Sequence, residues 1–265
     1  MNNCNTSNIS TRQTITTHFK KHAVFYISCG LFILSLALRV TFYILRDRIS
    51  RDSYTYIKFA ELLYQNAWDW NVVYLKGLNV SFPPLLIMVM AFGAELGIDI
   101  KLAGDLFVLT MGSLIPVGIF LCSEHIFKKR IYACFAAMLI VVHPYSIELS
   151  ANILRDAPYH CFFIFALLAA IHAINSQRLL HWVLFAIIAG LAALTRREGI
   201  ELVLIFLVWN VVWLIKNRDQ FKQNFILSCK QCGLVLLCFL LTTFPLWLYI
   251  SLNSDATWEL VPFVN

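Results

Sequence analysis

Charged residues are scarce in this sequence. Only 14% of its 265 residues are Asp, Glu, Lys or Arg, whereas 60% are hydrophobic. A soluble domain carries about a quarter charged residues, so this shortage excludes an ordinary soluble fold. Several separate apolar runs approach the roughly 20 residues that a helix needs to cross a bilayer. The sequence therefore predicts an all-α, multi-pass membrane helical bundle.

Signals for signal-peptide cleavage, structural zinc and nucleic-acid binding are also missing. The first apolar run, 23–45, begins late and is too long for the core of a cleavable signal peptide, so we expect a retained anchor. Among the eight cysteines, Cys229 and Cys232 form one C-x-x-C pair, with neither a second pair nor a nearby histidine. This pattern argues against a zinc or redox site. The net charge of +6 is explained by loops facing the cytoplasm, and we expect no nucleic-acid partner.

The apolar runs predict about seven transmembrane helices. The eight runs are 23–45, 83–98, 102–122, 131–147, 159–174, 180–195, 200–215 and 225–252. The second begins at Pro83-Pro84 and carries Glu95, so we expect it to lie in the membrane interface. The cytoplasmic segments then hold eleven Lys and Arg against two acids, as the positive-inside rule requires. Residues 1–22 are expected to form a disordered cytoplasmic tail, and 23–265 one module whose long first outer loop carries interfacial helices.

This topology places three polar clusters at the outer face, while Arg39 stays inside the first crossing. The clusters are 46–52, 148–156 and 196–198. After the first cluster, a helical period puts four apolar residues on one side: Tyr56, Phe59, Leu62 and Leu63. Ionisable residues near membrane depth are costly and usually functional. Carboxylates that can take a proton, facing arginines that can bind an anion, predict an active or binding site.

Four motifs in the predicted outer segments carry a family resemblance. They are Arg51-Asp52-Ser53-Tyr54, Phe82-Pro83-Pro84-Leu85, Arg155-Asp156-Ala157-Pro158 and Leu194-Thr195-Arg196-Arg197-Glu198-Gly199. As an ordered set, they resemble those of the polytopic glycosyltransferases of the GT-C superfamily. The closest branch is that of the dolichyl-phosphate-mannose-protein mannosyltransferases and the lipid A aminoarabinose transferase. The resemblance runs from about residue 23 to residue 263, although many relatives have Asp-Glu where this chain has Asp52-Ser53.

The resemblance implies a membrane glycosyltransferase of the cell envelope. Such an enzyme moves a sugar from a polyprenyl-phosphate-linked donor to an acceptor hydroxyl on a lipid, glycan or protein, with inversion at the anomeric carbon. Its active site would lie on the outer face of the bacterial cytoplasmic membrane. Metal use varies across the superfamily, so a divalent metal is left open.

The resemblance also implies roles for particular residues. Asp52 and Asp156 are the candidate catalytic residues. Asp52 would remove or orient the acceptor proton, while Asp156 would share that role or hold a metal or an arginine. The candidates for binding the donor and its lipid phosphate are Arg196, Arg197, Tyr54 and Arg51. Arginine suits this task because its planar guanidinium matches two phosphate oxygens.

Each motif also has a purely structural explanation. Asp156 could cap the helix of the fourth crossing, and Pro83-Pro84 could simply begin a helix. Arg196 and Arg197 could be snorkelling anchors. The alternative function is a non-catalytic transporter, flippase-like or accessory membrane protein for lipid-linked sugars. Transporters often show internal repeats; no repeat is visible here.

Overall fold

The computed structural model of the protein describes residues 5–46, 50–75, 83–217 and 221–253, and in these ranges every regular element is a helix. In chain order the elements are α1 (Asn5–Leu45), α2 (Arg51–Gln65), α3 (Trp70–Leu75), α4 (Pro84–Glu95), α5 (Ile100–Phe127), α6 (Arg130–Val141), α7 (Pro144–Ala151), α8 (Asp156–Ser176), α9 (Leu179–Thr195), the short 3₁₀ helix η1 (Arg197–Gly199), α10 (Ile200–Lys216) and α11 (Phe221–Asn253). The predicted all-α membrane helical bundle is confirmed. Residues 47–49 of the first polar cluster and Phe82 of the second motif lie outside the described residues.

Helix lengths separate the membrane-crossing segments from the shorter ones. Within the described ranges, five segments are long and apolar enough to cross a bilayer: His22–Leu45, Ile100–Phe127, Asp156–Ser176, Arg197–Lys216 and Gln223–Leu246. α6 and α7 meet at a bend of 57° and would together form a sixth. α9 has 17 residues, or about 26 Å of helix, which is close to the bilayer core of about 30 Å. The expected count of seven stays a prediction.

α4 is the helix that the sequence placed in the membrane interface. It has 12 residues, so it is only about 18 Å long and falls short of the bilayer core. Pro83 takes the capping position and Pro84 the first helical position, where a proline loses no hydrogen bond. The length of α4 therefore supports its placement in the membrane interface. Its two prolines mark where the helix begins.

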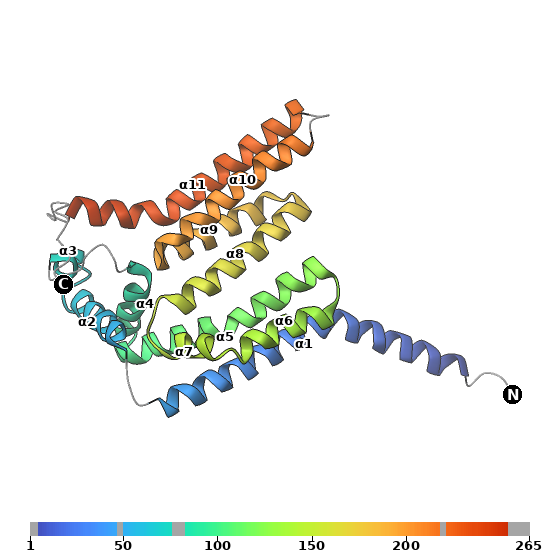
Figure 1. The fold of residues 1–265 in the computed structure, drawn as a ribbon, viewed down its shortest axis with the longest axis horizontal. Coiled ribbons are helices and arrows are strands. Elements are labelled where there is room, and N and C mark those ends of the chain that lie inside the picture. The colour runs from blue at the N-terminus through green and yellow to red at the C-terminus, as the bar shows by residue number, and fades with distance from the viewer. Residues whose placement is uncertain (1–4, 47–49, 76–82, 218–220, 254–265) are drawn as a thin grey trace.

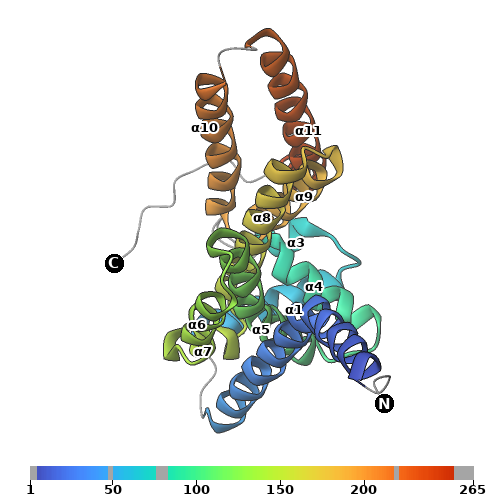
Figure 2. The same cartoon turned by 90° about the vertical axis from the view of Figure 1, so that its right-hand side faces the viewer.

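The long helices form a layered bundle (Figure 1). α5 packs against α1, α6 and α8, and α9 packs against α8 and α11. The α10–α11 pair lies at one edge of the bundle and α1 at the opposite edge (Figures 1 and 2). α2, α3 and α4 gather at one end of the bundle (Figure 1). α1 begins at Asn5, ahead of its apolar run, and the division of the chain at residue 22 stays a prediction.

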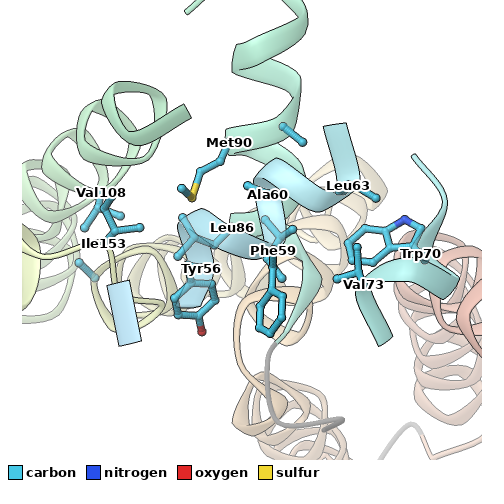
Figure 3. Close-up of a cluster of buried hydrophobic side chains, with 13 residues drawn as sticks. Tyr56, Phe59, Ala60, Leu63, Trp70, Val73, Leu86, Met90, Val108 and Ile153 are labelled. Atoms are coloured by element: carbon cyan, nitrogen blue, oxygen red, sulfur yellow. The ribbon is translucent and has the colours of Figure 1, made fainter. Parts of the chain in front are cut away.

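α2 is amphipathic, and its apolar face builds the core at this end. The Ser50 hydroxyl accepts a hydrogen bond from the Ser53 amide at 3.1 Å and so caps the helix. The buried residues of this face are Tyr56, Phe59, Ala60 and Leu63, with Leu62 packed beside them, as the helical period predicted. They pack in one cluster with Leu86, Ile87 and Met90 of α4, Trp70 and Val73 of α3, Val108 of α5, Ile153 and Ala157 (Figure 3). This core fixes α2 against α4 and so determines where the first turn of α2 lies.

The connection from α9 to α10 is as short as the sequence predicted. α9 ends at Thr195 and α10 begins at Ile200, with only η1 between them. A Cβ atom at Gly199 would lie 2.3 Å from the amide nitrogen of Ala193 and 2.5 Å from the carbonyl carbon of Ala192. Glycine is therefore required where the chain turns back against the last turn of α9.

Candidate active site

Three junctions that are far apart in the sequence lie on the side of the bundle that carries α2–α4 (Figure 1), and side-chain contacts link them in pairs. Arg46, directly after α1, donates hydrogen bonds from Nη1 to the Ala151 carbonyl and, at 2.8 Å, to Oδ1 of Asn152. Arg196, directly after α9, forms an ion pair with Asp156 at the start of α8. The structure thus brings together residues of all three predicted polar clusters. Which side of the membrane this end faces stays a prediction.

Arg196 lies between two carboxylates. Its Nη1 is 2.6 Å from Oδ1 of Asp156, and its Nε is 3.1 Å from Oε1 of Glu198. The guanidinium also lies over the Tyr159 ring, 5.7 Å from its centre. Asp156 is the first residue of α8, and Arg155 occupies the capping position without a side-chain cap bond. The carboxylate of Asp156 is therefore directed to Arg196 instead of capping the helix.

The contacts of Arg196 leave part of its guanidinium available. The side chain is 29% exposed, and two contacts account for only some of the five N–H donors that a guanidinium offers. A second anion could approach the free donors of Arg196 from solvent.

Asp52 stands in contrast to Asp156. It lies exposed in the first turn of α2 and forms no ion pair with any described residue. One turn further along, Tyr56 is buried, and its hydroxyl oxygen accepts a hydrogen bond from Arg155. Burial raises the pKa of Tyr56; Arg155 opposes this shift, and the charges of Asp156 and Asp52 add to it. The neutral Tyr56 hydroxyl is therefore within electrostatic range of both candidate carboxylates.

The other predicted donor-binding residues lie on the surface. Arg51 and Arg197 are exposed, and Tyr54 is 66% exposed. Residues two apart on a helix point to nearly opposite sides, so Tyr54 points away from the buried face that carries Tyr56. It is the hydroxyl of the buried Tyr56 that lies within electrostatic range of both carboxylates.

Asp105 is a carboxylate of this region that the sequence analysis did not single out. It is 3% exposed on α5, and its Oδ2 accepts hydrogen bonds from Lys101 Nζ at 2.8 Å and from the Tyr43 hydroxyl at 2.7 Å. Nη2 of Arg46 lies 3.5 Å from its other oxygen. Because Arg46 also bonds to the Ala151 carbonyl, this cluster joins α1 and α5 to the segment before α8. An acidic residue inside an apolar run was the signal that could have identified it.

The chain matches a known protein family over more than half of its length. The model of the dolichyl-phosphate-mannose-protein mannosyltransferase family matches residues 81–249. The chain belongs to this family. It is a membrane glycosyltransferase of the GT-C type and an integral membrane protein, as the sequence predicted. No curated protein matches the chain.

The range matched by the mannosyltransferase family includes Asp156 and Arg196 but begins after Asp52. A role for Asp52 therefore depends on its sequence motif and on its place in the fold. Among the described residues, no three His, Cys, Asp or Glu side chains form a group that could hold a metal ion.

Proposed function

We propose that this protein transfers a sugar from a polyprenyl-phosphate-linked donor to an acceptor hydroxyl, with inversion at the anomeric carbon. The observation that carries the proposal is the Arg196–Asp156 ion pair at the end of the bundle where Asp52 is exposed and makes no ion pair with the residues that the structure describes. A transferase of this kind needs one fixed cation for the leaving phosphate and one free carboxylate for the acceptor proton. This end of the bundle offers both.

Arg196 is the proposed ligand of the donor phosphate. It directly follows α9, and it keeps N–H donors that its two carboxylate neighbours do not use. A guanidinium can bind two phosphate oxygens at once, and it stabilises the charge that grows on the phosphate as the sugar leaves. Arg197, Arg51 and Tyr54 are exposed around this end and are proposed as secondary contacts with the donor.

The two carboxylates are proposed to act differently. Asp156 already contacts Arg196, so we assign it to holding the guanidinium in place. Asp52 is exposed, and we assign it to the acceptor. In the transfer step, the acceptor oxygen bonds to the anomeric carbon while the bond from that carbon to the phosphate oxygen breaks. The acceptor proton passes to Asp52, and polyprenyl phosphate leaves as an anion beside Arg196.

The charge pattern of the loops supports an active site on the outer face of the bacterial cytoplasmic membrane. The acceptor is then a hydroxyl of a lipid, glycan or protein of the cell envelope. Because the prenyl chain of the donor lies in the membrane and its phosphate at the membrane surface, we propose that its sugar phosphate meets the partly exposed side chain of Arg196.

The test is a turnover assay with the purified full chain in lipid nanodiscs. A panel of radiolabelled polyprenyl-phosphate sugars is offered together with an extract of envelope acceptors, and the release of polyprenyl phosphate is measured. We expect release with at least one donor and its loss in Asp52→Asn. If no donor is consumed but a labelled donor crosses the bilayer in proteoliposomes, the protein is a flippase, and the proposed transfer is wrong.

A further inference from the structure

Arg39 is a buried cation within the membrane-crossing part of α1, six residues before the helix ends at Leu45. Its residue surface is 0% exposed. Nη1 donates hydrogen bonds to Oγ of Ser35 at 2.5 Å and to the Ser35 carbonyl at 3.3 Å, and Nη2 donates to Oγ of Ser146 at 3.0 Å. All of these partners are neutral, and Arg39 takes part in no ion pair among the described residues. Its Nε is buried without a hydrogen-bond partner there.

An arginine in this position needs a counter-charge. Burying an ion is costly, and buried charges are normally paired or lie beside a cavity through which an ion or substrate passes. Because the described part of the chain supplies no carboxylate to Arg39, the missing anion is expected from a ligand.

A cavity of about 320 Å³ lies among α5, α6, α7 and α8. Arg39 does not line it, but Ser146, a hydrogen-bond partner of Arg39, does. This volume falls within the range of ligand pockets, about 300–1,000 Å³. Most of its wall is apolar, including Ile115, Ile119 and Ile164. The polar part of the wall comprises His143, Tyr145, Ser146, Ser150 and His160. The cavity therefore suits an amphipathic molecule with one polar group.

Ser146 connects Arg39 to this cavity. Its hydroxyl oxygen accepts the hydrogen bond from Arg39, so its own proton is free to be donated to a ligand. Gly112 of α5 lies beside both groups: a Cβ atom there would be 2.2 Å from Oγ of Ser150 and 3.2 Å from Nε of Arg39. The absence of a side chain at this position lets the guanidinium approach the serine side of the cavity wall.

We propose that this cavity binds the phosphate group of an anionic membrane lipid. The hydroxyl of Ser146 would donate to the phosphate, Arg39 behind it would supply the counter-charge, and the lipid chain would lie along the apolar wall. A lipid fits better than a soluble anion because the apolar wall belongs to membrane helices. Asp52, Asp156 and Arg196 do not line the cavity, although Ala157 and His160 of its wall follow Asp156 on α8. The proposed lipid site therefore adjoins the proposed donor site without sharing these three residues.

The probe is dodecyl phosphate, added to the purified full chain in dodecyl maltoside and counted by native mass spectrometry. Dodecyl maltoside has the same dodecyl tail as the probe but no charge, so it is the control for binding of the tail alone. Inorganic phosphate is the control for binding of the phosphate group alone. We expect saturable binding of dodecyl phosphate at least about tenfold tighter than that of inorganic phosphate. Arg196→Gln, which removes the proposed donor phosphate ligand, should retain at least one bound molecule.

Two variants test the residues of the site. Ser146→Ala leaves Arg39 in place and should weaken this binding about tenfold, the scale of one charge-assisted hydrogen bond. Arg39→Gln should weaken it at least as much; if that variant does not fold, Ser146→Ala decides. Ser113→Ala is the matched control, because Ser113 is another buried serine of the bundle whose hydroxyl donates to the Leu109 carbonyl of its own helix.

The proposal is overturned if Ser146→Ala and Ser113→Ala bind the probe equally well. It is also overturned if Arg196→Gln alone removes all binding, because the probe would then occupy only the donor site. Equal affinity for inorganic phosphate would refute the assignment to a lipid. None of these outcomes depends on sugar transfer, so the fate of the proposed function is decided separately.

Discussion

Arg196→Lys keeps the positive charge after α9 but removes the planar guanidinium. In the structure two different nitrogens of Arg196 face Asp156 at 2.6 Å and Glu198 at 3.1 Å. Lysine has one nitrogen and cannot contact both carboxylates while also binding a phosphate in a bidentate manner. The loss of one enclosed charge-assisted hydrogen bond is worth about 1.5–3 kcal/mol. Arg196 and Asp156 are 29% and 24% exposed, so we discount this to about 1–2 kcal/mol for solvent screening.

This free energy corresponds to a fall of about 5- to 30-fold in kcat/KM for the donor. The assay measures initial rates over a range of donor concentrations in nanodiscs, with thermal unfolding as the check on folding. Arg178→Lys is the matched control, because Arg178 is exposed at the opposite end of α9. An unchanged kcat/KM in Arg196→Lys would show that Arg196 is a snorkelling anchor. The donor phosphate would then have to bind elsewhere.

Four further outcomes are expected. Asp52→Asn should lower kcat by about a hundredfold or more, the usual contribution of a general base; near-normal turnover would exclude Asp52 from that role. Asp156→Asn should instead raise the donor KM about tenfold, because it releases the guanidinium of the phosphate ligand, and a pure kcat effect would contradict this assignment. Gly199→Ala should lower the free energy of unfolding by about 1–3 kcal/mol through overpacking against α9; a melting curve that matches wild type would show that the turn has room for a methyl group. In a cysteine-depleted chain, an impermeant thiol reagent should label Glu61→Cys from outside and Lys128→Cys only after the membrane is opened, and the reverse pattern would overturn the topology.

The local structure of α2 was predictable from the sequence because the helix has two different faces. Tyr56, Phe59 and Leu63 follow the helical period, and all three are buried in one core. The short length of α4 was also foreseeable from its bounding Pro83 and Gly97, since Gly97 has a φ of 77° that favours glycine. Where helix ends and amphipathic faces are encoded locally, the sequence is sufficient.

The contacts of the site were less predictable. α8 and α9 are apolar on nearly all sides, so their periodicity does not reveal which face of one helix packs on the other. The ion pair between Asp156 and Arg196 depends on that packing, and the sequence predicted only that the two residues share one face. Tyr54 was predicted to contact the donor, whereas Tyr56 was predicted only to lie on the apolar face of its helix. The hydrogen bond from Arg155 to the Tyr56 hydroxyl depends on how α2 packs beside the start of α8, which the sequence of α2 does not reveal. Asp105 was overlooked because a single acid hardly alters the hydropathy of a long apolar run.

The contacts of Arg46 indicate what the partly buried charges at this end of the bundle contribute to the fold. Arg46 lies beside Asp105 of α5 and bonds to Ala151 and Asn152, which directly precede the segment leading to α8. Buried ion pairs are weak sources of stability compared with apolar packing, so their value here lies more in fixing geometry than in holding the fold together. Arg46 precedes Asp52 by six residues, and Asn152 precedes Asp156 by four. The guanidinium of Arg46 therefore connects the end of α1 to the segment that leads to Asp156, and Asp52 follows Arg46 in the sequence.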